Sequence, residues 1–474
     1  MFSIRFSMMC ASLALGSLML APDSQAAMAT MINSGENSSC GVTTAGAAMC
    51  WGHNNAGQLG NGNQIDSAVP VGVTGLGSGV RQVAVGVNHA CAVLVDGTAR
   101  CWGWNVAGQL GNGTVTNTSV VPVQVTGLTG AIAIAAGWAQ GCAVLATGIV
   151  KCWGANNAGQ LGDGTLIGRT TPVEVLGINN AIGVSIGWSH ACVVLNTGRV
   201  NCWGQNGNGQ LGDGTTVTRI TRVEVLGISD AESVVVGANH TCAKTTSGAV
   251  KCWGRGASGA LGNGGTTDSA IPVAVTGLSS GVAQISAAPK SHSSCAVLSD
   301  GSAKCWGDNT YGILGTGDRV GRLLPTTVVG LAGPVSSITI GVSVSCARVR
   351  GGVQCWGDNS LGQHGAGNTA QVSFPQNAVG LFGSIPTILP VTLSPVTSRW
   401  PVYTWKAIPG ASSYRLRING VTTSYTAAAV NCPDGVGLCT FASGLLAPGV
   451  YGWQVQGFSE YGDGQWSALT QFML

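Results

Sequence analysis

The chain has 474 residues, of which only 8% are charged, and its 21 basic and 18 acidic side chains give a net charge of +3. So weak a charge excludes the basic stripe with which nucleic-acid-binding proteins contact phosphates. Glycine (75 residues) and cysteine (17 residues) recur at regular intervals, which favours a rigid repeat protein over a disordered one.

Residues 1–26 are expected to be a secretory signal peptide. A single basic residue precedes an apolar stretch, and small residues follow at Ser24 and Ala26, as is typical of signal-peptidase cleavage. No other stretch is long and apolar enough to cross a bilayer. Export therefore predicts a secreted, periplasmic or cell-surface protein, from which Cys10 is removed with the signal.

A Cys-Trp-Gly triplet recurs every 50 to 53 residues. The triplets begin at Cys50, Cys101, Cys152, Cys202, Cys252, Cys305 and Cys355. A second cysteine stands nine or ten residues before each triplet, at Cys40, Cys91, Cys142, Cys192, Cys242, Cys295 and Cys346. An apolar run, a turn ending in glycine and a second short strand separate the two cysteines, which predicts a β-hairpin in every repeat.

The two cysteines of each hairpin are expected to form a disulfide. A three-residue loop with glycine in the left-handed position sets them opposite each other. In the last repeat the loop shrinks to Arg350-Gly351, and the pair Cys346 and Cys355 stays opposed. Opposed residues in antiparallel strands lie about 4.5–5.5 Å apart at Cα, within the span of a disulfide.

The cysteine count indicates an oxidising compartment. Without Cys10, 16 cysteines remain, of which fourteen lie in the hairpins and two, Cys432 and Cys439, are expected to pair near the C-terminus. No odd thiol is left over. A zinc site is not expected, because the chain has no Cys-x-x-Cys pair.

Residues 28–383 are expected to form an all-β, seven-bladed β-propeller. Each repeat adds two strands to its hairpin, a Pro-containing one such as Val69 to Val73 and an alternating one such as Val80 to Val85. Four short antiparallel strands per repeat fit a propeller blade. Both faces of a blade contact neighbours, so the tryptophan of each triplet is expected to pack between blades.

Ring closure is expected to be of the Velcro type. The first repeat begins without a Pro-containing strand, and a matching segment, Phe374 to Leu381, follows the last hairpin. One blade would then combine this C-terminal strand with three N-terminal ones, which removes the open edge.

The C-terminal region departs from the repeat pattern. Prolines are spaced through residues 384–398, which predicts a linker. Residues 399–474 contain alternating strands with Trp405, Tyr414 and Trp453, and they resemble a fibronectin type III or immunoglobulin-like β-sandwich.

One face of the disk is the candidate binding site. Hairpin topology places the residue four before the first cysteine and the residue three after the second cysteine at the same end of the hairpin. In three consecutive repeats these residues include Trp104, Trp138 and Trp188, and exposed tryptophans are typical binding anchors. The alternative is that the indoles cover neighbouring blades as lids. The equivalent positions elsewhere include His53, Arg255, Asp308 and Asp358, the last two forming an expected acidic sector over repeats six and seven.

No catalytic residue, metal site or cofactor is expected. His89, His190 and His240 each belong to a separate repeat, where a structural role is favoured over a shared metal site. The loops around Asp163 and Asp213 carry one carboxylate each, too few for calcium, and suit Asx turns. No nucleophile elbow, metalloprotease helix or phosphate-binding loop is present.

Three segments carry a family resemblance: Gly-Val-Asn-His-Ala-Cys-Ala-Val at residues 86–93, Cys-Trp-Gly-Trp-Asn at 101–105 and Gly-Gln-Leu-Gly-Asp-Gly-Thr at 159–165. They resemble the repeats of the regulator of chromosome condensation family of seven-bladed propellers. The resemblance covers about three quarters of the chain and implies the fold. The founding member is a nuclear guanine nucleotide exchange factor. The signal peptide, the paired cysteines and the low charge depart from it, so no exchange-factor residue is transferred.

Function is therefore expected to be non-catalytic binding of an extracellular protein or glycan by a monomer through one propeller face. A polysaccharide-active enzyme is the alternative, and it would need the carboxylates of Asp308 and Asp358 about 5–9 Å apart. Guanine nucleotide exchange activity, as the family resemblance implies, is a further alternative. Ultraviolet-B sensing is another possibility, because Gly137-Trp138 and Gly187-Trp188-Ser-His190 resemble units of the plant photoreceptor. The arginines that adjoin those units are absent here, and export argues against the role.

Overall fold

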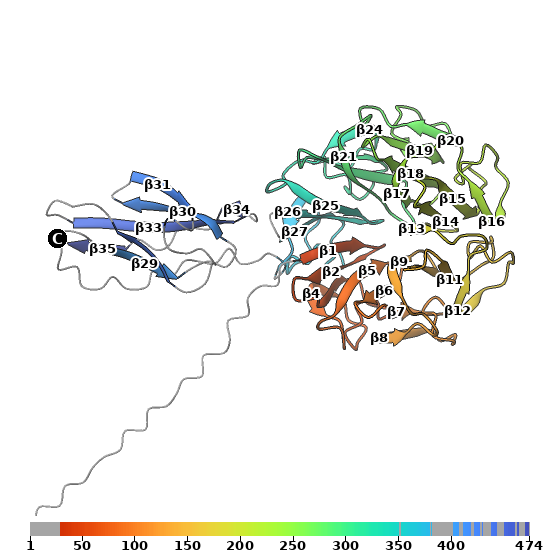
Figure 1. Cartoon of the computed structure of the whole chain (residues 1–474), viewed down its shortest axis with the longest axis horizontal. Coiled ribbons are helices and arrows are strands. Elements are labelled where there is room, and N and C mark those ends of the chain that lie inside the picture. Colours follow the sequence, from red (N-terminus) through yellow and green to blue (C-terminus); the bar gives the residue numbers. More distant parts are fainter. Residues whose placement is uncertain are drawn as a thin grey trace, which may run out of the picture.

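The computed structural model describes residues 29–349, 352–379, 381 and, further on, 402–406, 411–418, 421–426, 429, 438–442, 450–459, 462–463 and 470–473. Between residues 29 and 379 these ranges form seven four-stranded antiparallel sheets arranged in a ring, as a seven-bladed propeller requires (Figure 1). The all-β, seven-bladed fold class is confirmed.

The first strands of the sheets lie innermost, because those of successive sheets contact one another (Figure 1). They are β1 (Ala29–Ser34), β5 (Val80–Val85), β9 (Ala131–Ala136), β13 (Ala181–Ile186), β17 (Ala231–Val236), β21 (Val282–Ala287) and β25 (Val335–Ile340). The second strands are almost fully buried between neighbouring sheets. They are β2 (Ser38–Thr43), β6 (His89–Leu94), β10 (Gln140–Leu145), β14 (His190–Leu195), β18 (His240–Thr245), β22 (Ser293–Leu298) and β26 (Val344–Val349).

The third strands carry the Cys-Trp-Gly triplets. They are β3 (Ala48–Gly52), β7 (Ala99–Trp104), β11 (Val150–Gly154), β15 (Val200–Gly204), β19 (Val250–Gly254), β23 (Ala303–Gly307) and β27 (Gly352–Gly357). The fourth strands form the half-exposed outer edge. They are β4 (Ser67–Gly72), β8 (Thr118–Gln124), β12 (Arg169–Glu174), β16 (Arg219–Glu224), β20 (Ser269–Ala274), β24 (Arg322–Thr327) and β28 (Val372–Asn377). A short 3-10 turn, η1 (Ala257–Gly259), follows β19.

The predicted Velcro closure is wrong. Each of the seven propeller sheets consists of four strands that are consecutive in the chain, so β28 pairs with β27 and β4 completes the first sheet. The reason is that the Pro-containing strand folds back onto the hairpin that precedes it, which sets Cys50 opposite Val71. There it is the outer edge of the blade, where the N–H that proline lacks is not needed.

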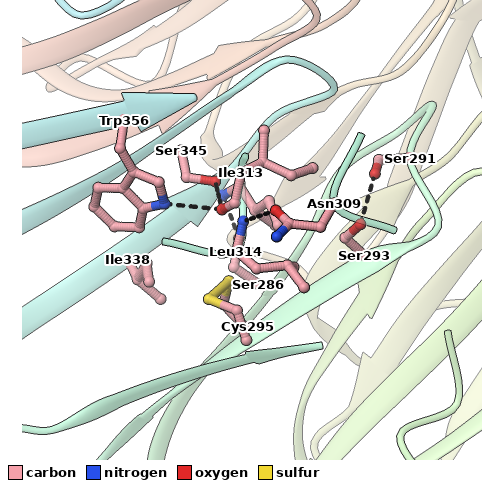
Figure 2. The surroundings of a disulfide bond; sticks show 12 residues. Ser286, Ser291, Ser293, Cys295, Asn309, Ile313, Leu314, Ile338, Ser345 and Trp356 are labelled. Carbon is pink, nitrogen blue, oxygen red and sulfur yellow. Dashed lines mark hydrogen bonds between the residues drawn. A yellow bond between two sulfur atoms is a disulfide. The ribbon is translucent and has the colours of Figure 1, made fainter. Parts of the chain in front are cut away.

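The ring closes through the same interface that joins the other blades. Each triplet tryptophan is fully buried and donates its indole N–H to a backbone oxygen of the preceding blade at 2.8–3.1 Å. The donor and acceptor pairs are Trp51 and Gln363, Trp102 and Gln58, Trp153 and Gln109, Trp203 and Gln160, Trp253 and Gln210, Trp306 and Ala260, and Trp356 and Ile313. The predicted packing of these tryptophans between blades is confirmed. Figure 2 shows Trp356 and Ser345 donating to the same Ile313 oxygen.

All seven hairpin disulfides form as predicted, between directly opposed residues. Their Cα atoms lie 4.0–4.1 Å apart, slightly closer than the expected 4.5–5.5 Å, and all fourteen cysteines are fully buried. The pairs are Cys40 and Cys50, Cys91 and Cys101, Cys142 and Cys152, Cys192 and Cys202, Cys242 and Cys252, Cys295 and Cys305, and Cys346 and Cys355. So many bridges indicate an oxidising environment. The pairing predicted for Cys432 lies outside the described residues.

The C-terminal strands form two further sheets. One pairs β29 with β32, and the other runs β31, β30, β33, β34, with β35 also pairing β33. Their bounds are β29 (Val402–Lys406), β30 (Ala411–Ile418), β31 (Val421–Thr426), β32 (Leu438–Ala442), β33 (Val450–Ser459), β34 (Gly462–Asp463) and β35 (Thr470–Met473). The fibronectin type III or immunoglobulin-like assignment of this region stays a prediction.

Two predicted segments, the signal peptide at 1–26 and the linker at 384–398, lie outside the described residues. Among the residues that are described, none belongs to a helix with the length and apolar character of a membrane span.

Candidate binding face

Two sets of loops share one face of the propeller, which we call the loop face. The inner loops join the first and second strands, at residues 35–37, 86–88, 137–139, 187–189, 237–239, 288–292 and 341–343. The outer loops join the third and fourth strands. At the start of each of these outer loops, a backbone N–H donates to a backbone oxygen in the inner loop of the same blade. Trp104 N donates to the Asn88 oxygen at 2.8 Å, and His53 N donates to the Asn37 oxygen at 2.9 Å. The structure thus places the predicted candidates on a common face.

The inner loops form a collar around the centre of the ring. Backbone N–H groups of Val87, Trp138, Ala238 and Val342 each donate to the inner loop of the adjacent blade, at 3.0–3.4 Å. The loops approach so closely that a Cβ on Gly137 would lie 2.6 Å from the next loop's backbone oxygen. Glycine is therefore required there, and side chains beside it are held by a rigid backbone.

Trp138 and Trp188 meet on this collar. Their ring centroids lie 6.1 Å apart and the rings are inclined by 56°, a tilted aromatic pair. Trp188 is 38% exposed and Trp138 is half-buried, in contrast to the fully buried triplet tryptophans. The side-chain amide of Gln140 donates to the backbone oxygen of Trp188 at 3.1 Å and fixes its loop. Trp104 is half-buried, and no ring contact joins it to the pair within the described structure.

An ion pair joins other inner loops of the collar. Lys290 Nζ lies 2.6 Å from Glu36 Oε1, and Ser343 Oγ donates to the Glu36 backbone oxygen at 2.8 Å. Blades one, six and seven are thereby linked. The sequence reasoning missed this pair. Its signal was the 53-residue spacing of the sixth repeat, because the longer inner loop carries Lys290.

The predicted acidic sector consists of separate turn-capping carboxylates. Asp308 Oδ1 accepts hydrogen bonds from Thr310 at 3.2 Å (N) and 2.7 Å (Oγ1). Asp358 accepts from Gln371 Nε2 at 2.6 Å, from Ser360 and from its own loop. Each carboxylate is thus occupied within its surroundings.

The two remaining candidates differ in their contacts. The ring of His53 lies 3.4 Å from the Gln58 amide. The half-buried Arg255 side chain has no ion pair or hydrogen bond within the described part of the chain.

Two of the buried histidines, His190 and His240, link neighbouring blades. His190 Nε2 lies 3.0 Å from Thr241 Oγ1, and His240 Nε2 lies 2.8 Å from Ser294 Oγ, each in the next blade. Burial lowers the pKa of both imidazoles to about 3 and that of His89 to about 4, so all three are neutral at pH 7. Among the described residues no three His, Cys, Asp or Glu side chains gather as a metal site would require.

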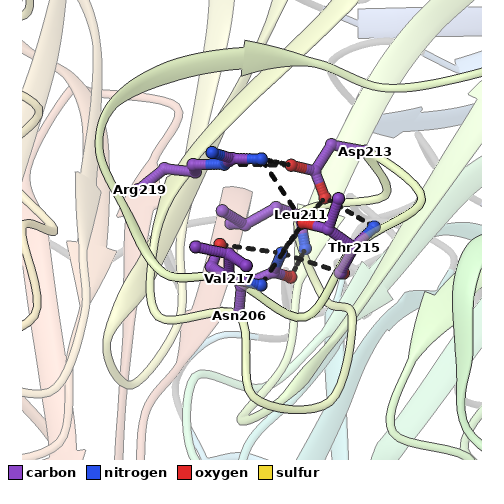
Figure 3. Close-up of polar contacts among 6 residues, drawn as sticks. All are labelled: Asn206, Leu211, Asp213, Thr215, Val217 and Arg219. Carbon is purple, nitrogen blue, oxygen red and sulfur yellow. Dashed lines mark hydrogen bonds and ion pairs between the residues drawn. The ribbon is translucent and has the colours of Figure 1, made fainter.

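The Asx turns predicted at Asp163 and Asp213 are present, and each includes an arginine that the sequence reasoning missed. Figure 3 shows Asp213 accepting from Thr215, from Asn206 and, through Oδ2, from Arg219 at 2.9 and 3.1 Å. Burial raises the pKa of the Asp213 carboxyl, but the hydrogen bonds from Thr215 and Arg219 outweigh it and leave this pKa below its usual range.

Comparisons with known proteins identify the fold family. The RCC1-like domain matches residues 17–292, and the regulator of chromosome condensation (RCC1) repeat matches 282–313 and 300–348. Ultraviolet-B receptor UVR8 of Arabidopsis thaliana is 37% identical over 135 residues, which are 28% of this chain and 30% of the receptor. Protein RCC2 homolog of Danio rerio is 35% identical over 134 residues, 27% of each chain. The aligned part spans less than a third of the length of these curated relatives.

Solved structures agree on the fold. Human WBSCR16 superposes with a TM-score of 0.62 at 20% identity, covering 73% of this chain and 96% of that one. Prp20p from Saccharomyces cerevisiae gives 0.61 at 20% identity, covering 80% and 90%. Because the RCC1-like domain match extends over more than half of the residues, this chain belongs to the RCC1-like domain family.

Proposed function

We propose that this RCC1-like propeller is an exported, non-catalytic interaction module that binds an extracellular protein or glycan through its loop face. The observation that carries the proposal is the Trp138 and Trp188 pair, because these indoles are held on a rigid collar with Trp188 38% exposed. Tryptophans of this kind supply a large share of the binding energy at interfaces.

The disulfides support the extracellular part of the proposal. All fourteen cysteines of the propeller hairpins are paired and buried. Disulfides persist in oxidising compartments outside the cytosol, whereas the reducing cytosol keeps thiols free. A ligand outside the cell membrane, such as a secreted protein or a surface glycan, is the corresponding partner.

The carboxylates support binding over catalysis. An enzyme of the glycoside hydrolase type needs one carboxyl group that is free to donate a proton and another free to act as base or nucleophile. Asp308 instead caps a turn at Thr310, and Asp358 caps a turn at Ser360 and also accepts from the Gln371 side chain. These hydrogen bonds engage both carboxylates within their own loops, which favours a structural role over that of an acid or base in catalysis.

The proposal is tested by retention of the purified mature protein on culture-supernatant proteins and cell-surface glycans. Replacing Trp138 and Trp188 together by alanine should weaken retention at least tenfold, since each anchor contributes about 2 kcal/mol or more. Val95→Ser is the control, because Val95 is 66% exposed in a hairpin turn on the opposite face. Unchanged retention of the double variant would refute the proposed face, and turnover of a polysaccharide would favour the enzyme.

A further inference from the structure

We infer that the partner is a protein whose contact surface is apolar and bordered by a carboxylate. The inference rests on the proposed function and names its partner class. The loop face is divided into an apolar sector over blades two to four and a charged sector over the other blades. The apolar sector consists of Val115, Trp138, Leu166, Ile167, Trp188 and Val217.

Aliphatic side chains at the tips of the outer loops are strongly exposed. The exposed fractions are 61% for Val115, 56% for Leu166, 63% for Ile167 and 57% for Val217. Each of these outer loops is held to the next blade by a backbone hydrogen bond. Gly113 N, for example, donates to the oxygen of Thr170 in β12 at 2.9 Å. The tips are therefore held in place, and exposed apolar groups gathered on one face are typical of a docking surface.

The combination of apolar tip and apolar inner loop is restricted to this sector. Blades one and six also expose an apolar tip, Ile65 and Val320. Their inner loops, however, carry the charged residues Glu36 and Lys290. In blades three and four the inner loops carry the tryptophan pair instead. Among the described blades, an exposed apolar tip and an inner-loop tryptophan occur together in these two, beside the outer-loop ion pairs Asp163–Arg169 and Asp213–Arg219.

This composition fits a protein better than a glycan. Sugars are held by aromatic rings together with polar side chains that bond their hydroxyl groups. Valine, leucine and isoleucine supply neither. Aliphatic and aromatic groups together are what the buried centre of a protein interface contains, with charged groups kept to its margin.

The margin of the sector carries a positively charged side chain that makes no ion pair within the described residues, although the carboxylate of Asp268 lies nearby and accepts from the adjacent Gly256 N–H at 2.9 Å. Arg255 lies on the loop face in blade five, next to the apolar sector, and its guanidinium has no ion pair within the described residues. By contrast, Arg319 donates to Gln371 at 2.8 Å and Asp308 caps Thr310. Charge complementarity therefore places an acidic side chain of the partner opposite Arg255.

Two probes applied to the full-length mature protein test the inference: a phage-displayed library of random dodecapeptides and a glycan array. Selected peptides should be rich in large apolar residues and contain an aspartate or glutamate. Their binding should fall at least tenfold both in the Trp138→Ala/Trp188→Ala variant and in a Leu166→Ser/Ile167→Ser variant, and several-fold in Arg255→Gln. Val95→Ser should bind as the wild type does.

The outcomes separate this inference from the proposed function. A glycan whose binding depends on the tryptophans and is unaffected by Leu166→Ser/Ile167→Ser would overturn the protein partner and leave the binding function standing. Peptides that bind the Leu166→Ser/Ile167→Ser variant fully would also overturn it. Failure of both probes on the wild type would overturn the binding function too. Circular dichroism melting of each variant, matched to the wild type, shows that a loss of binding is not a loss of fold.

Discussion

Trp51 donates its indole N–H to the backbone oxygen of Gln363 at 2.9 Å, although 312 residues separate the two. The bond joins the first blade to the seventh and repeats the contact that the other triplet tryptophans make with their preceding blades. The ring is therefore closed by a repeated side-chain interface, and no strand is exchanged between its ends. The strength of this seam depends on the individual side chains that line it.

Trp51→Phe should lower the free energy of unfolding by about 2–3 kcal/mol, because it removes one buried hydrogen bond and leaves both a cavity and an unpaired carbonyl. Trp203→Phe is the matched variant within the ring, since Trp203 makes the same bond to Gln160 at 2.9 Å. Urea unfolding without reductant should show losses of similar size. A negligible loss for Trp51→Phe beside a full loss for Trp203→Phe would mean that other contacts hold the seam.

His364 makes the seam differ from the other interfaces. It is fully buried where the other six repeats have a buried leucine, and its Nε2 has no hydrogen-bond partner within the described structure. The leucines are Leu59, Leu110, Leu161, Leu211, Leu261 and Leu314. His364→Leu removes this unsatisfied nitrogen, whose usual cost is about 1–3 kcal/mol, but also the hydrogen bond between the ring and the Gly357 backbone, so it should raise the free energy of unfolding by about 1 kcal/mol. Urea unfolding at pH 7 measures the gain, and a loss of stability would contradict it.

The disulfide register could be predicted from sequence, whereas the grouping of strands into blades could not. Loop length alone decides which hairpin residues are opposed, so the shortened loop before Cys355 still gave the correct partner, Cys346. In a ring of like repeats, however, a Pro-containing strand can be grouped with the hairpin before it or the one after it. The two are distinguished by the strand pairing in the structure, such as that of Cys50 with Val71.

For the candidate site, the face on which each residue lies could be predicted from sequence, but the contacts between residues of different blades could not. Strand direction places Trp104, Trp138 and Trp188 on one face, as the structure confirms. Which of them touch depends on the spacing of separate blades, and no local pattern encodes that distance. The pairing of Glu36 with Lys290 was hidden for the same reason, since the two residues belong to non-adjacent blades.

Acid should destabilise the propeller through its buried histidines. Burial lowers the pKa of His89 to about 4, whereas an unfolded histidine titrates near 6.5. Between these values the unfolded chain binds a proton that the folded chain does not, so stability is greatest above pH 6.5 and falls as the pH drops toward 4. His89→Gln removes the proton uptake by this residue on unfolding. Gln140, at the same position of the next repeat, shows that a glutamine is accommodated there.

The slope of unfolding free energy against pH, measured by urea titration between pH 4.5 and 6.5, should therefore be smaller in His89→Gln by up to about 1.4 kcal/mol per pH unit. Above pH 7 the variant and the wild type should have parallel curves. An unchanged slope in the acid range would show that His89 is protonated in the folded state.

Asp213 should be important for the stability of its outer loop. Its carboxylate accepts from Asn206, Thr215 and Arg219 (Figure 3), so Asp213→Ala removes several hydrogen bonds to a charged group. The expected loss of unfolding free energy is about 1.5–3 kcal/mol. Asp96→Ala is the control, because Asp96 caps only Thr98 in an exposed turn, and it should cost less. Equal losses in thermal unfolding would contradict a special role for the Arg219 contact.

The disulfides should determine whether the propeller folds at all. Each bridge closes a loop of nine or ten residues and contributes about 2–3 kcal/mol on the chain-entropy model. Cys192→Ala/Cys202→Ala should therefore lose about that amount when measured by urea unfolding. Loss of all seven bridges exceeds the entire stability of a typical domain, about 5–15 kcal/mol. The chain without residues 1–26 should then fail to fold in a reducing cytosol, whereas the full chain should fold after export to an oxidising compartment, as far-ultraviolet circular dichroism and protease resistance would show. A protease-resistant propeller with free thiols would contradict both the expected compartment and the role of the bridges.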